Sequence, residues 1–115
     1  MSPRASSAAA LRQGAPIFAA LGDATRLGIV ARLCRGGPAS ITALTEGSGV
    51  TRQAVAKHLR ILADAGLVTG VREGRESTWQ LLPGKLDAAR TALDQIAQQW
   101  DMALTRLRAL VEKDG

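Results

Sequence analysis

Residues 50–68 read Val-Thr-Arg-Gln-Ala-Val-Ala-Lys-His-Leu-Arg-Ile-Leu-Ala-Asp-Ala-Gly-Leu-Val and carry the signals of a complete amphipathic helix. The Thr51 hydroxyl can cap this helix by accepting a hydrogen bond from an unpaired backbone N–H of the first turn. Val50 can pack on Val55 as a hydrophobic staple, and Gly66 is a residue type that commonly follows a helix end. The apolar face comprises Val55, Leu59, Leu62 and Ala63. The opposite face comprises Arg52, Gln53, Lys57, Arg60 and Asp64.

A β-hairpin is predicted directly after this helix. Leu67 to Val71 favours a strand, Glu73-Gly74-Arg75 a turn, and Glu76 to Leu82 the returning strand. The tip of the hairpin carries charged side chains, including Arg72 and Arg75.

A short helix is predicted before residue 50. Ser40 can cap it, Ile41 and Leu44 would face inward, and it would end at Glu46-Gly47. The short helix, a tight turn, the helix after Thr51 and the hairpin form the plan of a winged helix-turn-helix.

A longer helix is predicted upstream, from an Asp23 cap to about Arg35. Its expected buried stripe is Leu27, Val30, Ala31 and Cys34, spaced at i, i+3, i+4 and i+7. Asp23 and Arg26 can pair at the start of this helix, and a phosphate contact by Arg26 is the alternative. For Cys34 we expect burial as a small hydrophobe. The alternative is a redox-sensing thiol activated by the neighbouring Arg32 and Arg35.

The N-terminal region is predicted to be a flexible arm over residues 1–13, followed by a short helix from Pro16 to Leu21. The alternative for the arm is a minor-groove or phosphate contact by Arg4 and Arg12.

The last segment, from about Leu86 to Glu112, is predicted to be one helix roughly 40 Å long. Its apolar residues recur every three or four positions: Leu86, Ala89, Leu93, Ile96, Trp100, Ala103, Leu107 and Leu110. A compact body with a radius of gyration near 13 Å cannot easily cover such a length. A second copy of the chain is therefore the simplest partner for this stripe. The alternative is that the helix packs entirely on its own domain.

Composition narrows the classes of function. The 115 residues suit one domain, and the net charge of +5 indicates a polyanionic partner. Residues 1–76 hold this excess, because residues 77–115 carry five basic and five acidic groups. One cysteine excludes an intramolecular disulfide framework and favours a cytoplasmic setting. No apolar run approaches the roughly 20 residues that span a bilayer, so no membrane association is expected.

These elements predict a mainly α fold with a small β-hairpin. We expect the winged helix-turn-helix domain at residues 14–84 and a long dimerisation helix at residues 85–115. An α-helix fits the major groove of double-stranded DNA, where Arg or Lys can reach guanine O6/N7 and Gln can reach adenine N6/N7. Arg52 and Gln53 occupy the first turn, which usually enters the groove, and the hairpin can lie along the DNA backbone or enter the minor groove.

Two stretches carry a resemblance to a known family: Phe18-Ala-Ala-Leu-Gly-Asp-Ala-Thr-Arg-Leu-Gly-Ile-Val and the quoted residues 50–68. Over about residues 15–112 the chain resembles the ArsR-type (arsenical-repressor-like) transcriptional regulators. The resemblance implies a homodimer built from the first and last helices that binds operator DNA as a repressor. The expected DNA-binding residues are Thr51, Arg52, Gln53, Lys57, His58, Arg60, Arg72 and Arg75. The expected dimer interface comprises Phe18, Leu93, Ile96, Trp100, Leu104 and Leu107.

The sequence departs from the family's metal sensors. Their arsenic-type Cys-x-Cys motif is absent from Ser40 to Glu46, and the last helix has Asp87, Asp94 and Asp101 but no His. Transition-metal sites need imidazole or thiolate ligands. We therefore expect no metal and no cofactor, and a release signal of another, unidentified kind.

Two further side chains have alternative roles. His58 lies beside the apolar face, which favours a structural or phosphate-contacting role over base reading or a pH-linked switch. Trp79 is expected to support the core or the wing.

Other classes of function fit less well. A winged-helix protein-interaction module without DNA binding is the main alternative, but its docking face would more often be apolar. RNA binding is not expected, because the chain has no aromatic platform on which RNA bases could stack. An enzyme is not expected, because no nucleotide-binding or nucleophile motif is present.

Overall fold

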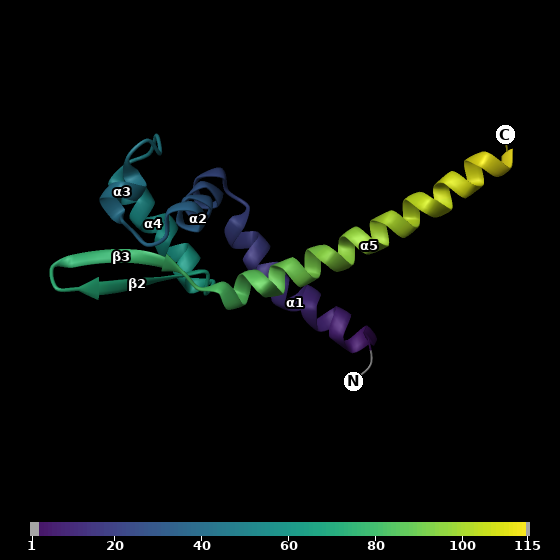
Figure 1. Cartoon of the computed structure of the whole chain (residues 1–115), viewed down its shortest axis with the longest axis horizontal. Helices are drawn as coiled ribbons and strands as arrows, with labels where there is room; N and C mark the ends of the chain where they lie inside the picture. Colours follow the sequence, from purple (N-terminus) through teal and green to yellow (C-terminus); the bar gives the residue numbers. More distant parts are fainter. Residues whose placement is uncertain (1–2, 115) are drawn as a thin grey trace.

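The computed structural model describes the backbone of residues 3–114 and the side chains of residues 8–113. Five helices and three short strands follow one another along the chain (Figure 1). They are α1 (Pro3–Leu21), α2 (Ala24–Gly36), β1 (Ala39–Ser40), α3 (Ile41–Thr45), α4 (Arg52–Asp64), β2 (Val68–Glu73), β3 (Glu76–Leu81) and α5 (Pro83–Asp114).

Local capping fixes the helix starts, as predicted. The side chains of Asp23, Ser40 and Thr51 accept hydrogen bonds from backbone N–H groups three residues ahead, at 3.0, 3.1 and 3.1 Å. At the end of α4, Gly66 adopts a φ of +80°, a conformation that favours glycine. The chain then turns so that the backbone N–H of Leu67 donates to the carbonyl of Leu62.

The core of the domain lies where α2, α3 and α4 meet the sheet. Val55, Leu59 and Leu62 of α4 are fully buried, which confirms the apolar face predicted for this helix. Leu44 of α3 is buried beside them, and Ile41 packs partly against the same core.

The sheet has the order β1-β3-β2 and is antiparallel throughout. The β2–β3 hairpin is the predicted wing, in register from Val68↔Leu81 to Glu73↔Glu76. Trp79 of β3 packs partly against the core, as expected for a supporting side chain. Strand β1 was not predicted, because two residues are too short to show an alternating pattern.

The predicted N-terminal boundary was wrong. The segment expected to be an arm and the segment expected to be a short helix form one helix, α1, from Pro3 onward. Tertiary contact explains the difference, since α1 packs on α5 and Ala10, Ile17 and Ala20 of α1 are buried. At Gly14 a Cβ atom would lie 3.0 Å from the Cβ of Ala92, so glycine permits the close crossing. Residues 1–2 and the Arg4 side chain lie outside the described structure.

The predicted buried stripe of α2 was also partly wrong. Leu27 is 53% exposed and Cys34 is exposed, whereas the buried residues are Ile29, Val30 and Leu33. Helix α2 carries apolar side chains on more than one face, so periodicity alone could not select the face that meets the core.

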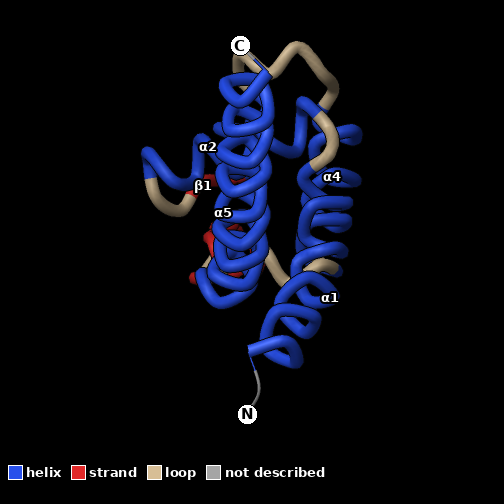
Figure 2. The backbone as a smooth tube through the Cα atoms, turned by 90° about the vertical axis from the view of Figure 1, so that its right-hand side faces the viewer, coloured by secondary structure: helices blue, strands red, loops and turns tan. Residues whose placement is uncertain are grey.

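Helix α5 extends far beyond the body of the domain (Figure 1). Figure 2 looks along the length of the molecule, with the C-terminal end of α5 toward the viewer. The helix has 32 residues, and Ala89 and Ala92 in its first half are buried. The distal half projects into solvent, which gives extents of 67 × 36 × 20 Å and a radius of gyration of 18.9 Å. Among the described helices, none is both long enough and apolar enough to cross a membrane.

Candidate nucleic-acid interface

Helix α4 presents a polar stripe to solvent, opposite its buried face. Thr51 and four side chains of the helix that follow it are exposed: Arg52, Gln53, Lys57 and Arg60. The burial of Val55, Leu59 and Leu62 fixes the rotation of α4 and so holds this stripe outward.

The wing carries a balanced charge at its tip. Arg72 and Arg75 are exposed, but the exposed Glu73 and Glu76 lie opposite one another in the hairpin register. Two carboxylates thus accompany the two guanidinium groups at the tip.

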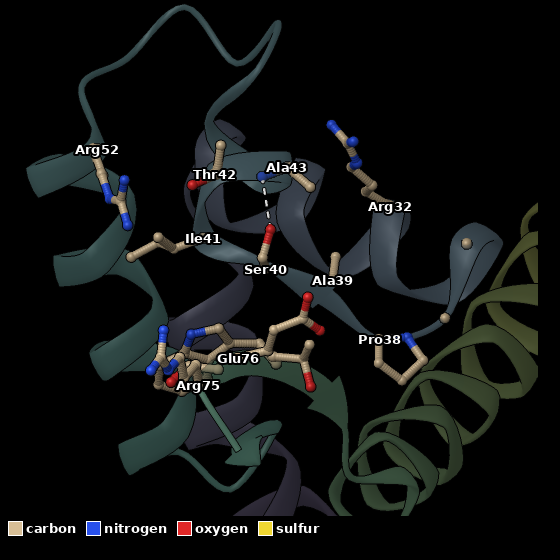
Figure 3. Close-up of a pocket in the computed structure, with 15 residues that line it drawn as sticks. Arg32, Pro38, Ala39, Ser40, Ile41, Thr42, Ala43, Arg52, Arg75 and Glu76 are labelled. Carbon is tan, nitrogen blue, oxygen red and sulfur yellow. Dashed lines mark hydrogen bonds between the residues drawn. The ribbon is translucent and has the colours of Figure 1, made fainter. Parts of the chain in front are cut away.

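A groove joins α4, the second helix of the helix-turn-helix and so its candidate recognition helix, to the wing (Figure 3). It has a volume of about 740 Å³ and is lined by the start of α3, by Arg52 of α4, by Arg75 of the wing and by Arg32 of α2. Three arginines from separate elements thus share one surface depression with a single carboxylate, Glu76, so its lining carries a net positive charge.

The turn between α3 and α4 is held by side-chain hydrogen bonds. Ser48 Oγ donates to the Thr45 carbonyl at 2.7 Å and accepts from the Val50 N–H at 3.2 Å. Arg32 donates from α2 to the Glu46 carbonyl at 3.3 Å. These contacts fix the angle between the two helices of the helix-turn-helix.

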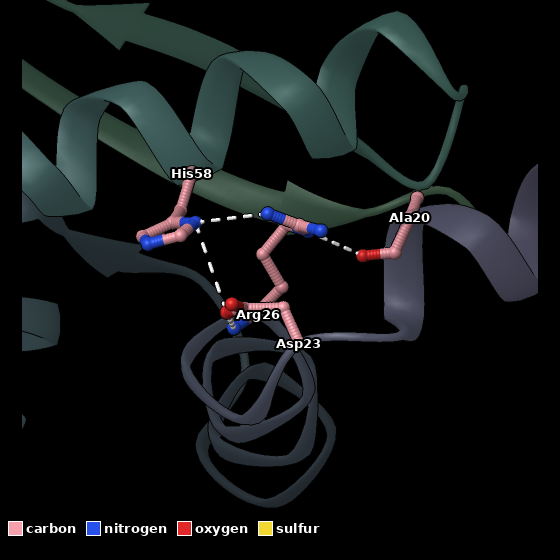
Figure 4. A network of polar contacts seen from close by, with 4 residues as sticks. All are labelled: Ala20, Asp23, Arg26 and His58. Atoms are coloured by element: carbon pink, nitrogen blue, oxygen red, sulfur yellow. Dashed lines mark hydrogen bonds and ion pairs between the residues drawn. The ribbon is translucent and has the colours of Figure 1, made fainter.

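His58 differs from the other expected DNA-binding residues, because it faces α2 (Figure 4). Its Nδ1 atom lies 3.2 Å from a terminal guanidinium nitrogen of Arg26 and 3.9 Å from Asp23 Oδ2. Asp23 and Arg26 meet at the helix start only through the cap, in which the backbone N–H of Arg26 donates to Asp23 Oδ2, whereas the Arg26 side chain contacts His58 and the Ala20 carbonyl. Sequence reasoning missed His58 as the third member, because 32 residues separate it from Arg26.

The Asp23 carboxylate is favoured in its charged form. The backbone N–H of Arg26 lowers the pKa of Asp23 below its ordinary 3.8, and the charge of the Arg26 side chain acts in the same direction. The folded pKa is depressed, so the stabilisation by Asp23 is complete above the ordinary value and is lost as the pH falls through the folded value.

The expected dimer residues fall into two groups. Leu93, Ile96, Trp100, Leu104 and Leu107 of α5 are all exposed. Phe18 of α1 instead packs partly against the core of its own chain. Met102, Leu110 and Val111 are also exposed. Leu110 and Val111 extend the exposed apolar stripe of α5, because helical spacing places them near the same face.

Within residues 8–113, no group of three or more His, Cys, Asp or Glu side chains is placed to hold a metal ion.

A helix-turn-helix followed by an antiparallel wing, with an exposed basic and amide stripe on its second helix, defines the class of winged helix-turn-helix DNA-binding proteins. A family model described as a helix-turn-helix domain matches residues 21–71. The regulator Rv2034 of Mycobacterium tuberculosis is 40% identical over 96 residues, which cover 84% of this chain and 86% of the relative. The chain belongs to the ArsR family of helix-turn-helix transcriptional regulators and is a DNA-binding regulator of transcription.

Two solved structures are similar over most of their length. An ArsR-like transcriptional regulator from Rhodococcus sp. RHA1 is 36% identical, with a TM-score of 0.68 and coverage of 86% of this chain and 92% of that one. The homodimeric winged helix-turn-helix DNA-binding domain of Mb0332 from Mycobacterium bovis is 30% identical, with a TM-score of 0.60 and coverage of 89% and 91%.

Proposed function

We propose that this regulator is a dimeric repressor that reads an inverted-repeat operator in double-stranded DNA and acts in the cytoplasm, without enzymatic activity. The observation that carries the proposal is the polar stripe of α4 beside a groove shared with the wing. Arg52 and Gln53, in the first turn of α4, have the donors and acceptors that read guanine and adenine in the major groove. Lys57 and Arg60 lie further along the helix and suit base edges or phosphates.

The dimer is supported by the unpartnered apolar stripe of α5. Trp100 is 66% exposed in the single chain, and large apolar side chains continue on both sides of it. Apolar surface of this extent is uncommon on a soluble monomer. The similar domain of Mb0332 is homodimeric. A second copy that contributes the same helix would place two recognition helices on one duplex.

We further propose that the release signal is not a transition metal of the Cys-x-Cys or His-Asp kind. The proposal rests on the donor types of this chain, because its one His is engaged with Arg26 and Asp23 and its one Cys stands alone on α2. Structural and sensory transition-metal sites draw on several imidazole or thiolate ligands.

Arg52→Ala and Gln53→Ala are each expected to weaken binding to a duplex enriched from a random pool by about 1–3 kcal/mol, or roughly 5- to 150-fold. Each change removes hydrogen bonds to a base, so discrimination at that base pair should also relax. Fluorescence anisotropy titrations at constant salt measure both effects. Arg106→Ala, an exposed α5 arginine, is the matched control for net charge. If all three variants bind alike, α4 does not read bases.

Arg72→Ala and Arg75→Ala should weaken binding to the enriched duplex and to random-sequence duplex by the same factor. Each phosphate contact that is lost should reduce the slope of log K against log salt concentration by about 0.9. Titrations from about 50 to 300 mM salt give this slope. If the slope on random-sequence duplex does not change, the wing arginines do not contact the phosphates of the DNA backbone.

A further inference from the structure

Three elements meet at one half-buried polar cluster (Figure 4). The Arg26 side chain donates from Nε to the carbonyl of Ala20, near the end of α1. A second guanidinium nitrogen of the same side chain lies 3.2 Å from His58 Nδ1, in the middle of α4. Arg26 therefore links the helix that crosses α5 directly to the recognition helix.

The chemistry of the two side chains sets the protonation state of this link. A guanidinium group can only donate, so Nδ1 of His58 must accept, and the ring must be neutral with its proton on Nε2. A proton on Nδ1 would place two donors 3.2 Å apart. The nearest acceptor for it is Asp23 Oδ2, at 3.9 Å. Among the described residues, Asp23 and Arg26 are the charged groups that contact the ring, and α1 contributes the uncharged Ala20 carbonyl.

The link between Arg26 and His58 lies where it can control the orientation of α4. The apolar face of α4 fixes how the helix rotates against the core, but dispersion contacts are not directional. The bond between Arg26 and His58 is directional, and the His58 side chain is only 20% exposed, so water competes weakly for it. Arg26 also donates from Nε to the carbonyl of Ala20 at the end of α1, where backbone carbonyls lack helical partners.

We propose that Arg26 and His58 are positioning residues that fix α4 against α1, and that protonation of His58 breaks this link and lowers sequence discrimination. The inference rests on the proposed DNA reading by α4. In the neutral state Arg26 holds both α1 and His58. In the protonated state the ring turns to Asp23, Arg26 loses its acceptor on α4, and α4 is no longer tied through Arg26 to α1.

The test compares affinities for the enriched duplex and for random-sequence duplex between pH 5.5 and 8. For the wild type, the ratio of the two affinities is expected to fall about tenfold as the pH is lowered, consistent with loss of a hydrogen bond to a charged group. His58→Asn keeps an acceptor near the Nδ1 position but cannot titrate, so its ratio should stay high throughout. His58→Phe and Arg26→Lys should show a low ratio at every pH.

Asp23→Asn tests whether the pH dependence arises from the His58–Asp23 pair, because a purely structural role of Asp23 would not change the midpoint of the pH profile. Asparagine retains a capping oxygen but lacks the charge that attracts the protonated ring, so the midpoint of the pH profile should shift to lower pH. Circular dichroism and sedimentation check that each variant keeps its fold and assembly.

Two results would overturn the inference: equal pH profiles for wild type and His58→Asn, or a wild-type ratio in folded His58→Phe. If His58→Phe fails to fold, the comparison of wild type with His58→Asn decides alone. Failure of the wild type to enrich any duplex would instead contradict the proposed function.

Discussion

Trp100→Asp should convert the dimer to a monomer and reduce affinity for the enriched duplex at least about a hundredfold. The substitution places a charge in the middle of the apolar stripe, where burial without a partner is costly. The loss on DNA is large because the second half-site is then no longer bound intramolecularly, and such linkage commonly contributes factors of about 10²–10⁴. Sedimentation velocity measures the assembly, and anisotropy titrations measure the affinity.

Met102→Asp is the matched control for this prediction. Met102 is 59% exposed, close to the exposure of Trp100, but two positions along a helix place it about 200° around the axis. This variant should remain dimeric and bind normally. A dimer that survives Trp100→Asp, or one that both substitutions disrupt equally, would show that the stripe is not the interface.

Leu59→Ala should lower the free energy of unfolding by about 2–5 kcal/mol. Leu59 has no exposed surface and lies at the centre of the apolar face of α4, so truncation removes buried methyl groups and leaves a cavity. Urea unfolding at one fixed protein concentration gives the change, and a shift in midpoint without a change in slope identifies a loss of stability.

Ile61→Ala on the same helix is the comparison, because Ile61 is only half-buried. It removes a similar volume from a site that is partly open to water, so its cost should be clearly smaller. Equal costs for the two variants would mean that the face of α4 assigned to the core is wrong.

The recognition helix could be predicted because its signals are local. The cap at Thr51, the apolar spacing from Val55 to Leu62 and the glycine after the helix all lie within one stretch, and each is confirmed. The wing follows for the same reason, since a hairpin depends on neighbouring residues.

The features that could not be predicted depend on distant partners. Residues 3–13 are helical because α5 supplies a surface for α1, and the Gly14–Ala92 approach that permits this crossing joins positions far apart in the sequence. The buried face of α2 is selected by its neighbours rather than by its own pattern, which is why Cys34 lies on the exposed side. The sequence could not show which of its alternative roles His58 has, because the residues that contact it, Asp23 and Arg26, lie at the start of α2, far from it in the sequence.

Selection of bound duplexes from a random pool at about 150 mM salt tests the proposed reading of DNA most directly. It reports sequence preference and symmetry together, with the full chain and no assumed operator. We expect an imperfect inverted repeat whose half-site centres lie about one helical turn, or roughly 10 base pairs, apart. Recovery of no preferred duplex, or of a single site without two-fold symmetry, would contradict a dimeric, sequence-specific regulator.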